Sequence, residues 1–128
     1  MNSEFETRNA EGNQDLRKRT FDFSLRVMRL AERLPDTRSG RTIANQIVRS
    51  GTSVGANYRA AKRAKSTKDF IAKMGIVEEE CDETIYWIEL AIASSCLQQD
   101  NVGNLLKEAN ELLAITVASI RTAKGRKE

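Results

Sequence analysis

The feature that most constrains the fold is an apolar stripe that recurs every three or four residues along one long segment. Its members are Phe70, Met74, Val77, Cys81, Ile85, Ile88 and Ile92. This spacing is the period of an α-helix that buries one face. Ser66, followed three residues later by Asp69, resembles a capping box that would begin such a helix. The sequence therefore predicts a helix of roughly 30 residues with a continuous buried side.

Three other segments show the same period. The first begins at Asp15 or Thr20, ends at Pro35, and carries two parallel apolar rows, which are Phe21, Leu25 and Met28, and Phe23, Val27, Leu30 and Leu34. The second extends to about Ala64 through Ile43, Ile47, Val54, Tyr58 and Ala61. The last follows the polar break QQDN and continues from Val102 to Ile120, ending near Gly125.

Four helices with short connections imply antiparallel neighbours. A single proline and seven glycines leave little material for the many turns of an all-β fold. We therefore expect an all-α protein, an antiparallel up-down-up-down four-helix bundle. Trp87, Ile76 and Ile71 lie off the main stripe of the third helix, which predicts a second buried face there.

The 128 residues fit one domain. We expect a flexible polar leader over residues 1–14, the bundle over 15–124 and a basic tail over 125–128. The N-terminal residues lack the apolar centre of a signal peptide, and no run of 18 apolar residues occurs. These observations favour a cytoplasmic protein with no membrane partner.

Composition argues against most catalytic and metal sites. Histidine, the commonest general base and zinc ligand, is absent. Cys81 and Cys96 would lie ~22 Å apart on one helix, too far for a disulfide. The acidic residues Glu78, Glu79, Glu80, Asp82 and Glu83 diverge around the same helix, which calls for cationic partners on another helix or subunit. We expect no enzyme activity, catalytic residue, metal, cofactor or small-molecule substrate.

The stretch RSGTSVGANYRAAKRAKS, residues 49–66, places small residues where the pattern requires a helix. Glycine in a helix costs about 1 kcal/mol relative to alanine, so close approach of another helix must compensate. The alternatives are a loop and a phosphate-binding loop, but Gly51 and Gly55 are spaced by three residues where a P-loop needs four. The candidate helix or subunit interface is Ser50, Gly51, Ser53, Gly55, Asn57, Tyr86 and Trp87.

Positive charge concentrates at the end of the second helix and the start of the third. The candidate nucleic-acid contacts are Arg59, Lys62, Arg63, Lys65, Lys68 and Lys73. Such a patch would bind RNA or DNA with a steep salt dependence and little sequence preference. The alternative is a solvated basic face that pairs with nearby acids. No aromatic residue is interleaved with the basic run to support base stacking.

The residues from Arg49 to Ala91 resemble the central signature of the four-helix-bundle family associated with intervening sequences in bacterial 23S ribosomal RNA genes. The most specific pieces are SVGANYR at residues 53–59, Asp69-Phe70, and Glu79, Asp82, Glu83 and Thr84 with Tyr86-Trp87. The resemblance extends over about Arg41 to Ile120, and the first helix matches only in pattern. Ala60 departs from the family, because many members carry a glutamate there.

The resemblance implies a homopentameric ring without a defined catalytic activity. A related branch, the accessory variability determinant of diversity-generating retroelements, binds nucleic acid and a reverse transcriptase through a basic outer surface. We therefore expect a non-enzymatic, homo-oligomeric scaffold, pentameric by resemblance and associated with RNA or the ribosome. The alternative is a nucleic-acid-binding accessory protein that acts with a reverse transcriptase or another nucleic-acid enzyme.

Overall fold

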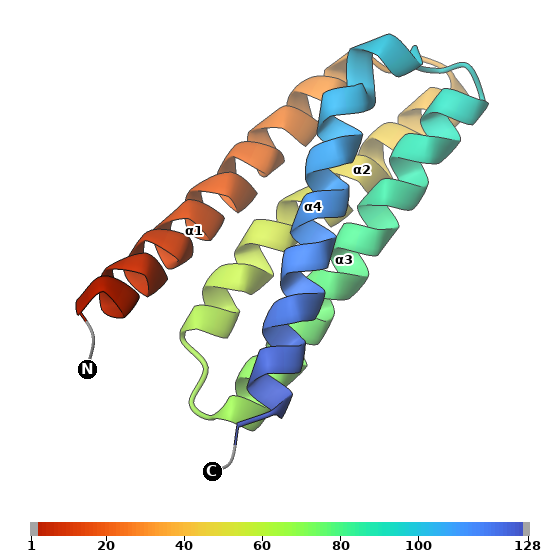
Figure 1. The fold of residues 1–128 in the computed structure, drawn as a ribbon. Helices are drawn as coiled ribbons and strands as arrows, with labels where there is room; N and C mark the ends of the chain where they lie inside the picture. Colours follow the sequence, from red (N-terminus) through yellow and green to blue (C-terminus); the bar gives the residue numbers. More distant parts are fainter. Residues whose placement is uncertain (1–2, 127–128) are drawn as a thin grey trace.

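The computed structural model describes the backbone of residues 3–126 and the side chains of residues 16–100 and 102–126. Its four helices are α1 (Ser3–Glu32), α2 (Arg38–Lys62), α3 (Thr67–Ala93) and α4 (Gln99–Lys124). They run alternately up and down and lie side by side in one bundle (Figure 1). The described residues contain no strand. The predicted all-α four-helix bundle is confirmed.

Besides α1, two helices begin earlier than the apolar pattern predicts. Helix α2 starts at Arg38, five residues before the first apolar position of its pattern at Ile43, because the Thr37 hydroxyl accepts a hydrogen bond from the Gly40 amide at 3.1 Å and caps the first turn. Helix α4 starts at Gln99, inside the expected polar break. Polar residues at a helix start contribute no apolar period, so the period locates the first buried turn rather than the helix end.

Helix α3 begins as the sequence predicts. The Ser66 hydroxyl accepts a hydrogen bond from the Asp69 amide at 3.0 Å. The Asp69 carboxylate accepts from the amide of Lys65 rather than from that of Ser66, so the motif is a capping box displaced by one residue. The first bond satisfies an amide that the first helical turn leaves without a partner, and the second satisfies the amide of Lys65, which precedes the N-cap residue.

Helix α1 begins at Ser3, whereas the apolar pattern predicts a start at Asp15 or Thr20. The side chains of residues 1–15 lie outside the described residues, so the flexible leader over residues 1–14 stays a prediction. Of the predicted basic tail, residues 127 and 128 lie outside the described part of the chain. Both predicted boundaries remain expectations.

The core lies where the inward faces of the four helices meet. Its largest fully buried side chains include Phe23, Val27, Ile47, Met74, Ile88 and Leu112. Helix α2 packs against both α1 and α3 and is the most crowded helix, whereas α1 and α4 meet over a short stretch. Arg19 joins that pair, because its guanidinium contacts Glu108 at 2.6 Å and Glu111 at 3.0 Å. A fork of this kind adds geometric specificity to the contact between the two helices.

Candidate functional site: the outer faces and the basic end of the bundle

The glycines of α2 lie where α1 approaches most closely. A Cβ atom on Gly51 would stand 2.6 Å from Cγ2 of Val27, and one on Gly55 would stand 3.2 Å from the backbone oxygen of Thr20. Contacts below 3.0 Å are too short for real Cβ atoms, so alanine at residue 51 would force the Val27 side chain or the α1 backbone to shift. The helix is continuous through this stretch, so neither glycine forms a loop.

Among the small polar residues of α2, only Ser50 bonds to another helix. Its buried hydroxyl accepts a hydrogen bond from the Thr84 hydroxyl of α3 at 2.9 Å and donates to the Gln46 carbonyl. Ser53 donates to the Arg49 carbonyl, and the Asn57 amide donates to the Ser53 carbonyl, within the same helix. Ser50 thus bonds across the α2–α3 gap, whereas Ser53 and Asn57, whose side chains are half-buried, bond within their own helix and stay candidates for a subunit interface.

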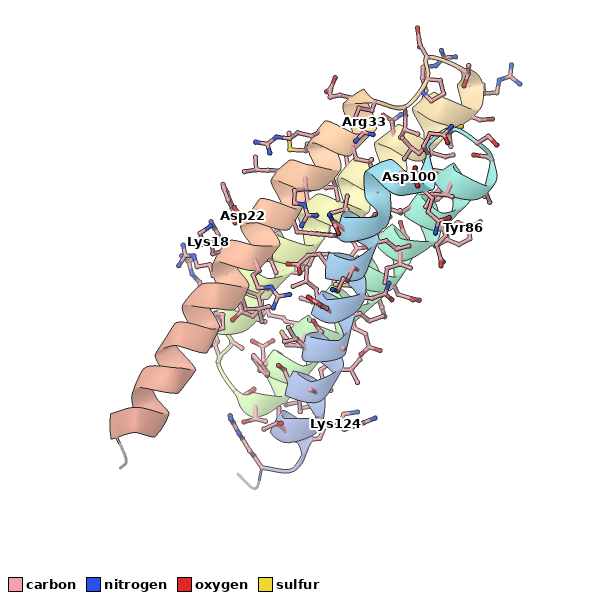
Figure 2. The ribbon with its side chains drawn as sticks, turned by 45° about the horizontal axis from the view of Figure 1, so that its top comes forward. Lys18, Asp22, Arg33, Tyr86, Asp100 and Lys124 are labelled. Atoms are coloured by element: carbon pink, nitrogen blue, oxygen red, sulfur yellow. The ribbon has the colours of Figure 1, made fainter. Side chains whose placement is uncertain are left out.

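Two rows of large apolar side chains face outward. On α1 the row is Phe21, Leu25 and Met28, and on α3 it is Ile76, Tyr86 and Leu90. Their exposures range from 36% to 55%. Helices α1 and α3 have no contact among the described residues, so they occupy diagonal corners. Figure 2 accordingly places Lys18 and Asp22 of α1 on the opposite side of the bundle from Tyr86 of α3.

Tyr86 and Trp87 point in different directions, as their adjacent positions require. Tyr86 is exposed and Trp87 is half-buried, with the two rings edge to face at 5.1 Å between centroids. The indole N–H of Trp87 donates to the carboxylate of Glu83 at 3.2 Å. Trp87 thus sits between the core and the row on α3, with its polar atom already satisfied.

The acidic run of α3 has its cationic partner within the chain. The Arg49 guanidinium of α2 contacts Glu80 at 3.2 Å and also pairs with Glu83. Glu80 and Glu83 are three residues apart and so lie on neighbouring positions of the α3 surface, where one arginine of α2 reaches both carboxylates. This cluster joins α2 to α3 and leaves Glu79 and Asp82 exposed. No group of three or more residues suited to hold a metal ion occurs in the described part of the chain.

The predicted nucleic-acid contacts fall at the end of the bundle where α2 turns into α3. We call Arg59, Lys62, Arg63, Lys65 and Lys68 the basic end; all five are exposed. Lys73 differs, because its ammonium group is bound by Asp69 at 2.6 Å. The hydrogen bond from Lys73 is the largest cause that lowers the pKa of Asp69, and the hydrogen bond from the Lys65 amide is the second largest. Lys62 and Lys65 also border a groove of about 950 Å³ that reaches Arg126 beyond α4.

Beside the basic end, α1 and α2 enclose a smaller hollow of about 660 Å³. Arg17 borders it from α1, and Arg59, Lys62 and Arg63 border it from α2. The guanidinium carbon of Arg59 lies 5.6 Å from the centroid of the Phe21 ring. The fold therefore brings an aromatic side chain to the basic residues, although the basic run itself contains none. The sequence feature that could have indicated this contact is Phe21, a member of the outer row of α1.

Both cysteines are free, and Cys96 lies beyond the end of α3 at Ala93, whereas the sequence predicts that one helix contains both. Burial raises the pKa of the Cys81 thiol to about 12, and the nearby carboxylates of Glu80, Asp82 and Glu78 act in the same direction. The thiol therefore keeps its proton near neutral pH, and a protonated thiol is a poor nucleophile. Among the described residues, no helix has both the length and the apolar character needed to span a lipid bilayer.

Comparisons with known proteins agree with this architecture. A crystal structure of a protein of unknown function, from the S23 ribosomal protein family of Bacteroides thetaiotaomicron, is 30% identical and superposes with a TM-score of 0.79. The similarity covers 85% of this chain and 97% of that one. No curated protein matches the chain. A family model described as 23S rRNA-intervening sequence protein matches residues 12–118, from the middle of α1 to near the end of α4, and the chain therefore belongs to that family.

Proposed function

We propose that this protein is a non-catalytic building block that assembles with copies of itself into a closed ring. The observation that carries the proposal is the pair of outer rows, one on α1 and one on α3, at diagonal corners of the bundle. A ring needs two different surfaces on each subunit, because each copy binds its neighbour head to tail. A two-fold dimer needs only one self-complementary surface.

The composition of the rows supports burial against a partner. Aromatic residues and methionine are enriched at protein interfaces, and the two rows contain Phe21, Met28 and Tyr86. A fully buried side chain of this size contributes roughly 1.5–3 kcal/mol relative to an exposed one. The family resemblance adds the number of subunits, which is five copies of the 14.4 kDa chain.

The decisive experiment uses one charged variant in each row, Leu25→Glu and Ile76→Glu. Light scattering should give a ring for the unaltered chain and smaller species for each variant, since a carboxylate cannot be buried there without a partner. Asn45→Glu, on an exposed position of α2 outside both rows, is the matched control and should assemble normally.

Mixing the two variants tests the head-to-tail geometry. The intact α3 row of the Leu25→Glu chain can bind the intact α1 row of the Ile76→Glu chain, and both remaining surfaces are blocked. The mixture should therefore stop at a heterodimer. A monomeric unaltered chain, or an Ile76→Glu variant that assembles as well as the unaltered one, would contradict the ring.

A second candidate function, nucleic-acid binding, is supported by the basic end. None of Arg59, Lys62, Arg63 and Lys68 forms an ion pair with a residue whose side chain is described. Surface cations without acidic partners can release counterions from a phosphate backbone, and a ring would repeat the patch in every subunit. The family description refers to 23S rRNA, which makes RNA the first ligand to test.

The test compares two triple variants that remove equal charge from opposite ends of the bundle. Lys62, Arg63 and Lys65 changed to glutamine should weaken RNA binding and reduce the slope of log affinity against log salt by roughly two to three. Arg33, Arg38 and Arg41 changed to glutamine form the control, since Arg33 lies at the far end from Lys124 and the end of α4 (Figure 2). Equal losses in both variants would indicate net charge alone and contradict a localised surface.

A further inference from the structure

The hollow between α1 and α2 contains a buried polar group without a partner. Tyr58 is 3% exposed and borders this hollow. Its hydroxyl makes no hydrogen bond to any described residue. Every fully buried side-chain nitrogen or oxygen atom among the described residues does have a partner. The Tyr58 oxygen must therefore keep a small accessible surface, and the hollow is the space that the residue borders.

The charges around this hydroxyl are all of one sign. Arg17, Arg59, Lys62 and Arg63 border the hollow, and no carboxylate does so among the described residues. None of these four side chains forms an ion pair with a described residue. Arg59 is held over the Phe21 ring, so one guanidinium stays beside the hollow. A ligand with several negative charges on one group would match this arrangement, since four cations exceed what one carboxylate can neutralise.

We propose that the hollow beside Tyr58 binds a phosphate group, with the tyrosine hydroxyl as hydrogen-bond donor and Arg17, Arg59 and Arg63 as charge partners. Arginine presents a planar fork of N–H donors that suits phosphate oxygens. Burial raises the pKa of Tyr58, so the hydroxyl stays protonated and able to donate at neutral pH. The volume exceeds that of phosphate alone and lies in the range of small-molecule pockets, which leaves room for a nucleoside.

Ala60 also borders the hollow, and its small neutral side chain adds no charge to the walls. A glutamate there would add a negative charge to the walls and repel a phosphate. The alanine of this chain therefore permits an anion where that residue would exclude one. This contrast supplies a direct test, because Ala60→Glu changes a half-buried position without touching the Tyr58 hydroxyl.

Isothermal titration calorimetry on the full chain tests the proposal with pyrophosphate, adenosine and ADP as probes. Pyrophosphate and ADP should bind, and adenosine should not. Tyr58→Phe should weaken binding about tenfold or more, as loss of a hydrogen bond to a charged group does. Tyr86→Phe, which removes the hydroxyl of the other tyrosine on the opposite side, should bind like the unaltered chain. Ala60→Glu should abolish detectable binding.

Oligonucleotides with and without a 5′-phosphate show whether the phosphate group that binds belongs to a nucleic-acid end or to a free nucleotide. Tighter binding of the phosphorylated oligonucleotide than of ADP would assign the hollow to a nucleic-acid end, and the reverse would assign it to a free nucleotide. Absence of binding by every phosphate compound, or equal affinities for Tyr58→Phe and the unaltered chain, would overturn the proposal. The described residues that line the hollow belong to α1, α2 and the cap after α2 of one chain, so light scattering on the same samples separates this result from any failure of ring assembly.

Discussion

The α1–α2 contact and the outer faces of α1 and α3 use similar residues with different outcomes. Gly51 belongs to the contact, Phe23 shares the core-facing row of α1 with Val27, and both are buried, whereas Phe21 and Gly75 belong to the outer faces. A Cβ atom on Gly51 would collide with Val27, and one on Gly75 would meet nothing within 4 Å. Glycine has the same intrinsic helix cost at both places. Only in the α1–α2 contact does the chain itself compensate for that cost.

The comparison shows that residue type alone does not separate a core from an interface. Both rows of α1 have helical spacing and large apolar side chains, and one helix cannot point both into the same core. The row that contains Phe23 is buried, and its member Val27 faces Gly51 of α2, whereas the row that contains Phe21 stays 38% to 52% exposed even with Arg59 of α2 beside the Phe21 ring. An unmatched second row on a helix is therefore the sequence signal for a surface that another molecule could cover.

The largest expected effect separates the two rows of α1. Phe23→Ala should lower the free energy of unfolding by about 3–5 kcal/mol, because it opens a cavity in a fully packed core. Phe21→Ala should change it by less than about 1 kcal/mol, since half of this ring is already exposed. Urea denaturation of both variants measures the difference. Equal losses in a monomeric background such as Leu25→Glu would show that the Phe21 row is part of the monomer core.

A smaller effect is expected at the glycine of the α1–α2 contact. Overpacking typically costs about 1–3 kcal/mol, whereas alanine has a helix propensity about 1 kcal/mol more favourable than that of glycine. Gly51→Ala should therefore lower the free energy of unfolding by about 1–2 kcal/mol. The double variant Gly51→Ala with Val27→Ala supplies the control, because the smaller side chain leaves room for the added methyl group. Additive losses in the double variant would contradict the close contact.

The fold could be predicted from the sequence, because the apolar period records which face of each helix is buried. Helix α2 was predicted through glycines and serines because the period stays in phase on both sides of Gly51 and Gly55. The start of α2 was missed, since Thr37 caps the helix through a polar segment without any period.

The site contacts were much less predictable. Arg59 meets Phe21, and Arg49 meets Glu80 and Glu83, across pairs of helices. Such pairs depend on the rotation and axial position of one helix against another, which a single sequence does not record. The sequence identified the basic residues one by one, but it could not show that Tyr58 lies among four of them.

The buried hydroxyl pair between α2 and α3 should contribute less than the apolar contacts. Ser50→Ala should cost about 1 kcal/mol, the net value of a typical hydrogen bond. The loss stays moderate because the Thr84 hydroxyl can still donate to the Glu80 carbonyl, 2.7 Å away. Ser53→Ala is the matched control, with an expected change near zero, because its hydroxyl bonds only within its own helix. Thermal unfolding of the two variants tests this, and a larger loss for Ser53→Ala would contradict the assignment.

The smallest expected effect has the opposite sign and returns to the glycine of the outer face. Gly75→Ala should raise the free energy of unfolding by about 0.5–1 kcal/mol, because alanine restricts the unfolded chain and meets no obstacle within the chain. Gly75 and Tyr86 are eleven residues apart, close to three helical turns, so both lie on the same side of α3. The measurement should therefore be made twice, in the monomeric Leu25→Glu background and in the assembled protein. If the gain in the free energy of unfolding is seen in the monomer and disappears on assembly, a neighbouring subunit approaches α3 at Gly75 as closely as α1 approaches α2 at Gly51. A lower free energy of unfolding in the monomer would contradict the open space around Gly75.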